Sequence, residues 1–227
     1  LCRAELTGAA TPRAEVLVAQ GEAHSELGEF EAAREAFQRA LEAAPHGSTT
    51  MLEAYYGLLT TFDEDAEQHD RQLAVCLEAL EIYPLDAQLL CAMGSYLQRR
   101  EQLSLARRAF ETAVRYGQVD METWHLTEIA EVSAVCYALT LQLEGNEEEA
   151  HRQLREAAKR YPNSQRVWRA QLELNIKLGD DDRAAALVRE PFVDRQQQPT
   201  LTDAVRGACR AAEEDWTAAI GLLQSAY

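Results

Sequence analysis

Apolar residues recur at intervals of three and four along most of the chain, which is the period of amphipathic helices. In the first clear copy of the pattern, Gly28 separates two such stretches at the point where a helical hairpin would turn. The small residues Gly21 and Ala33 stand where the two helices would cross most closely, and Pro45 ends the second stretch. The pattern therefore predicts a hairpin of two antiparallel helices over residues 14–47.

The same arrangement of large and small residues recurs at a nearly constant period. We expect Phe30 and Phe37 of the first copy to fill the space between one hairpin and the next. Because the pattern is interrupted at both ends, we expect residues 1–13 to be the tail of a preceding helix or an N-terminal cap, and the chain to be a piece of a longer protein. Further units are expected at about 50–84, 87–120, 121–164, 165–199 and 200–227.

The positions of Leu17, Gly21, Gly28, Phe37 and Pro45 resemble the tetratricopeptide repeat, a helical hairpin of about 34 residues. The resemblance covers residues 14–227. It implies an all-α fold, a right-handed superhelical solenoid of about six antiparallel helical hairpins. It also implies that the first helix of each hairpin lines a concave surface and that this surface binds other proteins.

Two segments depart from the regular period. The separation of Gly57 and Pro84 exceeds that of Gly21 and Pro45 by three residues, so we expect additional residues within 62–70.

The second departure is a run of helical spacing that begins at Met121, well before the regular start of the fourth unit. It predicts an extended first helix of about 23 residues with Asp120 as its N-cap. Met121 and Trp124 on this extension form a candidate docking surface. The alternative is that the extension packs on the preceding hairpin.

Residues that favour the N-cap position support the phase of the repeats. Thr50 and Glu53 have the spacing of a capping box, and Asp86 and Asn163 stand just before predicted first helices. We therefore expect these residues to begin the first helices of their hairpins.

The composition excludes several classes of partner. A net charge of −16 disfavours nucleic acid, whose phosphates need a basic surface, and it disfavours acidic lipid surfaces. No run of eighteen apolar residues is present, so membrane insertion is not expected. Five cysteines without paired spacing fit a reducing compartment, and we predict a cytoplasmic protein. Arginine and alanine enrichment favours a bacterial origin.

Patterns typical of catalysis are absent from the sequence. It has no phosphate-binding glycine loop, no nucleophile elbow and no zinc-protease motif, and its five histidines share no spacing. An acidic run begins at Asp63, but Gln68 and Ala74 stand where a calcium loop needs Gly and Glu. We therefore predict no enzyme activity, no cofactor and no metal.

The resemblance directs one set of side chains on each first helix into the groove. The groove is expected to be acidic at its start, apolar in its middle and basic in the fifth unit, which suits an amphipathic helix or an extended apolar segment. Leu143 and Ile176 also fall at inward positions. The alternative is that the apolar positions are already covered by the extended helix or by another part of the protein. The candidate groove residues are Val18, Glu22, Leu58, Phe62, Arg99, Val135, Leu139, Arg166 and Arg169.

The sequence thus favours a scaffold that binds a protein or peptide partner. One alternative is a regulatory or targeting segment of a larger enzyme, such as a bacterial transferase. Self-association through the ends of the array is a further alternative.

Overall fold

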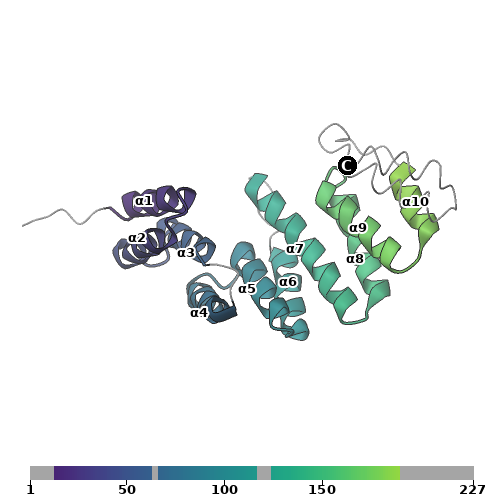
Figure 1. Cartoon of the computed structure of the whole chain (residues 1–227), viewed down its shortest axis with the longest axis horizontal. Coiled ribbons are helices and arrows are strands. Elements are labelled where there is room, and N and C mark those ends of the chain that lie inside the picture. Colours follow the sequence, from purple (N-terminus) through teal and green to yellow (C-terminus); the bar gives the residue numbers. More distant parts are fainter. Residues whose placement is uncertain (1–12, 63–65, 117–123, 190–227) are drawn as a thin grey trace, which may run out of the picture. The chain divides into compact units, whose positions relative to one another are not determined.

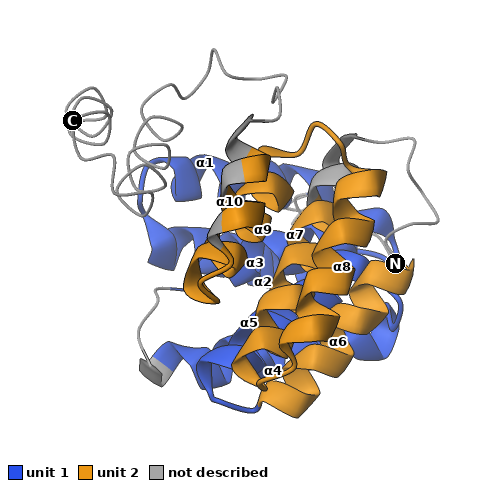
Figure 2. Cartoon of the chain, turned by 90° about the vertical axis from the view of Figure 1, so that its right-hand side faces the viewer, with its two compact units in different colours: residues 1–102 blue, residues 103–227 orange. Residues whose placement is uncertain are grey.

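A computed structural model describes residues 13–62, 66–116 and 124–189, and all regular secondary structure in these ranges is α-helical (Figure 1). The chain divides into two compact units, residues 1–102 and 103–227 (Figure 2). Residues 1–12 of the predicted N-terminal segment, the predicted unit 200–227 and the residues Asp120 and Met121 lie outside the described residues. The helices are α1 (Ala14–Glu26), α2 (Phe30–Ala43), α3 (Thr49–Thr60), α4 (Ala66–Ile82), α5 (Ala87–Arg99), α6 (Leu103–Tyr116), α7 (Trp124–Leu143), α8 (Glu147–Arg160), α9 (Gln165–Lys177) and α10 (Asp181–Arg189).

One buried cluster of the first unit surrounds the ring of Phe37. In this unit α1 packs on α2 and on α3, and α4 contacts α3 and α5. The Phe37 side chain is only 1% exposed and lies between Gly21 of α1 and Gly57 of α3. A Cβ atom added at Gly21 would approach the ring to 2.6 Å, and one added at Gly57 would come closer still. Glycine at both positions therefore lets one aromatic ring fill the space between two successive hairpins.

Phe37 confirms the predicted packing between hairpins, but the same prediction for Phe30 is wrong. Phe30 is the first residue of α2 and is 38% exposed. At the first turn of the helix its ring lies beside the hairpin turn, where neither α1 nor α3 encloses it.

The hairpin turns share one backbone geometry. At the ends of α1, α5, α7 and α9, an N–H group donates to the carbonyl oxygen five residues earlier, as from Glu29 to His24. This bond is the mark of a Schellman turn, which needs one residue with a left-handed backbone. Glycine supplies it in three of the turns, for example Gly28 with φ of +75°. In the turn after α5, Glu101 adopts φ of +58° instead.

At the helix N-termini, one of the predicted N-caps is confirmed and two are wrong. Asp86 is confirmed, because its side chain accepts a hydrogen bond of 2.8 Å from the backbone N–H of Leu89. Thr50 is wrong, because α3 begins at Thr49 and Ser48 accepts the bond from Met51.

The prediction of Asn163 as an N-cap is also wrong, because the next residue in the chain, Ser164, caps α9. The hydroxyl of Ser164 accepts from the N–H of Val167 at 3.2 Å. In both corrections a serine hydroxyl, one or two residues from the expected cap, lies three residues before the N–H that it satisfies.

The second unit has α7 at its centre. This helix contacts α6, α8 and α9, α8 also contacts α9, and α9 packs on α10. It has 20 residues, compared with 13 in α1 and 13 in α9. In the first unit α4 has 17 residues where α2 has 14, and it begins at Ala66.

The described residues confirm an all-α fold of successive helical hairpins. None of the described helices is both long enough and apolar enough to cross a membrane.

Candidate functional site

Two helices of the second unit expose apolar side chains on a shared surface. α7 and α9 lie side by side, and α8 contacts both. Because α8 covers one side of this pair, the side chains turned away from α8 form an outer surface. Leu143 is 53% exposed and Ile176 is 43% exposed, and Leu139 is half-buried. We call Leu139, Leu143, Arg166, Arg169 and Ile176 the α7–α9 surface.

The sequence of α7 explains why this surface is apolar. The helix is surrounded by three neighbours, so most of its side chains from residue 129 onward are buried, including Ala138, Thr140 and Leu141 at 2% exposure or less. The residues at 132, 136, 139 and 143 follow a spacing of four, three and four, which places them on one remaining side of the helix. These four are all apolar, and each is half-buried or exposed.

A hydrogen-bonded serine fixes α9 against α7. The hydroxyl of Ser164 caps α9 and also donates to Glu131 Oε2 of α7 at 2.7 Å. At the other side of α9, the indole N–H of Trp168 donates to the carbonyl oxygen of Leu187 in α10 at 3.2 Å. Partly buried hydrogen bonds therefore link α9 to both α7 and α10.

The charges of α9 give this apolar surface a basic edge. Arg166, Arg169 and Lys177 are exposed on the helix, with Glu173 between them. Arg169 Nε lies 3.0 Å from Glu173 Oε1, and both side chains are more than half exposed. Such an exposed pair is worth less than about 1 kcal/mol, so a partner carboxylate competes for Arg169 at little cost.

In the first unit, two of the predicted groove residues are buried instead of exposed. Val18 and Leu58 are 5% and 4% exposed and belong to the cluster around Phe37, so neither is accessible to a partner in this structure. Glu22 is exposed. Phe62 is half-buried, with the guanidinium carbon of Arg34 5.5 Å from its ring centroid.

The remaining predicted residues divide between the units. Arg99 is exposed at the end of α5 in the first unit. In the second unit Val135 is 8% exposed, whereas Leu139 is more open. Leu139 of α7 is half-buried, and Arg166 and Arg169 of α9 are exposed. The side chain of Trp124, the first residue of α7, lies outside what the structure describes.

The second unit also contains a pocket between α6 and α8, which was not predicted from the sequence. Its walls carry Glu111 and Arg115 from α6 and Glu156 and Arg160 from α8. The signal for it in the sequence is a glutamate followed four residues later by an arginine on two successive second helices.

The most strongly perturbed titratable groups of the first unit serve packing. Burial raises the pKa of the Cys76 thiol to about 12, and its Sγ atom lies 3.2 Å from the carbonyl oxygen of Leu89. Burial and the hydrogen bond to Asp86 raise the pKa of Tyr56, whose hydroxyl donates to Oδ2 of Asp86 at 2.6 Å. A thiol that stays protonated is a poor nucleophile. Among the described residues, no group of three or more His, Cys, Asp or Glu side chains is placed to hold a metal ion.

Comparison with known proteins identifies the repeats. Models of the tetratricopeptide repeat match residues 14–46 and 144–191. No curated protein sequence matches the chain.

Several solved structures are similar to the chain. One is from a functional characterization of Pseudomonas aeruginosa pilF, with a TM-score of 0.69, 15% identity, and coverage of 92% of this chain and 88% of that one. Another is YrrB, described as a TPR protein with an unusual peptide-binding site, with a TM-score of 0.55, 19% identity, and coverage of 82% and 88%. A third is MamA from Desulfovibrio magneticus RS-1, with a TM-score of 0.60, 15% identity, and coverage of 78% and 91%. At these identities the likeness concerns the fold.

Proposed function

We propose that this chain, which belongs to the tetratricopeptide repeat family, is a scaffold that holds a segment of a partner protein on its α7–α9 surface. The observation that carries the proposal is the exposure of Leu143 and Ile176 on two helices that pack side by side. Apolar side chains exposed together on a folded surface are typical of contact sites. The peptide-binding site named for YrrB supports the same class of partner.

The chemistry of the surface defines the segment that it would bind. In this proposal Leu139, Leu143 and Ile176 form the apolar part of the surface, and the exposed arginines at 166 and 169 supply its positive charge. A complementary segment is an amphipathic helix, or an extended stretch, with apolar residues flanked by Asp or Glu. The protein has a net charge of −16, so most of its surface would repel an acidic residue of the partner. The two arginines provide a place where such a residue can bind.

We propose binding rather than catalysis as the role of the chain. The raised pKa of Cys76 supports this role, because it removes the thiol as a nucleophile at neutral pH. In the first unit, Glu22, Phe62 and Arg99 stay candidate contacts for an extension of the bound segment. A cytoplasmic location stays a prediction.

The test uses peptides selected for binding to the protein itself. A displayed library of random twelve-residue peptides is selected against the full chain, and the enriched peptides are synthesised and titrated by fluorescence anisotropy. We expect apolar sequences that contain Asp or Glu. The double variant Leu143→Asp/Ile176→Asp should bind them at least about thirtyfold more weakly, because two contact side chains worth about 1 kcal/mol or more each are lost.

The matched control changes an equally exposed leucine elsewhere in the same unit. Leu105 of α6 is 47% exposed and lies outside the α7–α9 surface, so Leu105→Asp should leave the affinity unchanged. Substitution of buried Val135 or Leu58 is avoided because it would disturb the fold. Equal affinities for the wild type and the double variant, at unchanged helicity, would disprove the proposed surface.

A further inference from the structure

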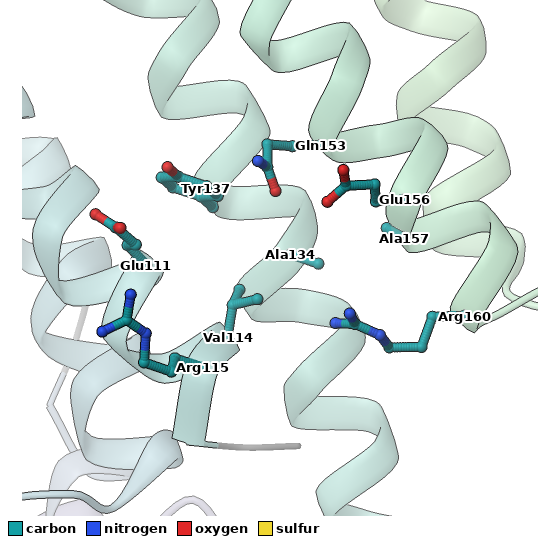
Figure 3. Close-up of a pocket in the computed structure, with 9 residues that line it drawn as sticks. All are labelled: Glu111, Val114, Arg115, Ala134, Tyr137, Gln153, Glu156, Ala157 and Arg160. Carbon is teal, nitrogen blue, oxygen red and sulfur yellow. The ribbon is translucent and has the colours of Figure 1, made fainter.

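A pocket of about 280 Å³ lies between the second helices α6 and α8, with α7 at its base (Figure 3). The base is formed by Ala134 and Tyr137, which differ from the α7 residues of the α7–α9 surface. Ala157 of α8 is 3% exposed and Ala134 is 7% exposed, so small side chains keep the pocket open. This is a surface separate from the one that we propose for the main partner.

The two walls repeat one pattern of charge. On α6 Arg115 follows Glu111 by four residues, and on α8 Arg160 follows Glu156 by four residues. In Figure 3 both carboxylates lie in the upper half of the view and both guanidinium groups in the lower half. Glu156 and Arg160 extend from α8 toward α6, whereas Glu111 and Arg115 extend from α6 away from α8. The pocket therefore has an acidic end and a basic end.

Among the described residues, part of this charge is not held in a close ion pair, although Arg152 lies near enough to Glu156 for their charges to interact. In the described ranges Arg115 and Glu156 form no ion pair. Glu111 lies 3.9 Å from Arg107, which is bound more closely, at 2.9 Å, by Glu144. A partner that supplies opposite charges at both ends gains contacts without breaking close pairs.

The spacing of the charges sets the geometry of the partner. Four residues of a helix rise about 6 Å along its axis, so the acidic and basic ends of each wall are separated by about that distance. A partner helix that carries oppositely charged residues four positions apart has the same spacing on one face. Its cation would meet Glu111 and Glu156, and its anion would meet Arg115 and Arg160.

The shape of the pocket decides between kinds of occupant. Its volume lies just below the range of about 300–1,000 Å³ in which small molecules are usually enclosed, so it suits one or two side chains of a larger partner. In a symmetric dimer a second copy would present the same hollow, and two hollows do not fill each other.

From these observations we infer a second docking site between α6 and α8. It takes a helix of a partner protein that carries Glu or Asp and Lys or Arg four residues apart, around a small apolar residue. Val114, Ala134 and Ala157 contact that apolar residue, and the four charged side chains of the walls pair with the partner's charges.

The probe is a blocked, alanine-rich peptide of twenty residues in which Glu and Lys are four residues apart. A matched peptide of the same composition has them two residues apart, on different faces of the helix. The first peptide should bind at least about fivefold more tightly and should lose affinity as salt is added. In NMR spectra of the full chain, it should shift the amide resonances around Arg115 and Glu156. Equal binding of the two peptides, or shifts confined to α9, would overturn the inference.

Two paired variants test the same site from the side of the protein. Arg115→Ala/Glu156→Ala should weaken the first peptide at least about fivefold. Arg108→Ala/Glu147→Ala removes one arginine from α6 and one glutamate from α8, both exposed and outside the pocket, and should leave binding unchanged.

An equal effect of the two variants would overturn the inference. So would a concentration-dependent dimer that only Arg115→Ala/Glu156→Ala abolishes, because a second copy would then be the occupant. Either result leaves the proposal for the α7–α9 surface standing.

Discussion

Replacement of Gly57 by alanine tests the packing that joins the first two hairpins. Gly57 lies on α3, and a Cβ atom there would overlap the ring of Phe37 more severely than the 2.6 Å contact at Gly21. Carbon atoms in a protein interior pack at about 3.5–4.0 Å, so the ring or the helix has to move by about 1 Å. The ring has no free side toward which to move, because Gly21 bounds its other face and Phe37 is 1% exposed.

The expected size of the effect follows from two opposing contributions. Overpacking of a filled core costs about 1–3 kcal/mol, and the confined ring of Phe37 places Gly57→Ala at the upper end. Alanine in place of glycine inside a helix returns about 1 kcal/mol. The variant should therefore lose about 2 kcal/mol of stability in the first unit. Glu53→Ala, at an exposed position of the same helix, should change stability by less than about 0.5 kcal/mol.

The assay is native-state amide hydrogen exchange, because it reports each unit of a repeat protein separately. Protection in α1, α2 and α3 should fall in Gly57→Ala, with little change in α8 and α9. In a Phe37→Leu background the smaller side chain leaves room for the new methyl group, so Gly57→Ala should cost less than about 1 kcal/mol. An equal loss of stability in both backgrounds, or a stabilised single variant, would refute the idea that the Phe37 ring packs tightly between Gly21 and Gly57.

Three further predictions concern the turns, the caps and the buried thiol. Glu101→Gly should raise the midpoint of urea unfolding by relieving a left-handed residue, with a gain of about 0.5–1 kcal/mol, and a lowered midpoint would contradict the turn geometry. Asp86→Ala should cost about 2 kcal/mol in urea unfolding, because the Leu89 N–H and the Tyr56 hydroxyl both lose their acceptor, whereas a loss below about 0.5 kcal/mol would show that neither bond matters. The free energy of unfolding should fall as the pH rises from about 9 to about 12, because the Cys76 thiol and the buried Tyr56 and Tyr96 hydroxyls ionise in the unfolded chain while burial keeps them protonated in the folded one. Cys76→Ala should reduce that slope by the contribution of the thiol, and an unchanged slope would contradict its raised pKa.

The fold was largely predictable from the sequence because the repeat depends on small residues at fixed places. Gly21 and Phe37 mark the close packing within and between hairpins, and Gly28 marks the turn. Glu101 takes the same left-handed conformation, although glycine, the residue that usually indicates it, is absent from this turn. The N-caps were harder to place, since Ser48 and Ser164 compete with neighbours of equal cap preference and the choice depends on where the hairpin packing lets the helix begin.

The candidate site was predictable only in part. The repeat positions predicted which side chains face a groove, and of these Leu139 is half-buried and Arg166 and Arg169 are exposed. The burial of Val18, Leu58 and Val135 depends on how closely neighbouring helices approach, and sequence spacing does not report that distance. A continuous groove through both units stays a prediction.

The central claim, that a partner segment lies on the α7–α9 surface, is tested most directly by site-specific photo-cross-linking. A photoreactive phenylalanine derivative is placed singly at Leu143, at Ile176 and at the control positions Leu105 and Leu85, all of which are exposed. A peptide selected against the wild-type chain is then irradiated with each variant, and the cross-linked mass is measured. Our account predicts cross-links from 143 and 176 and none from the two controls. Cross-links from 105 or 85, with none from 143 and 176, would contradict it.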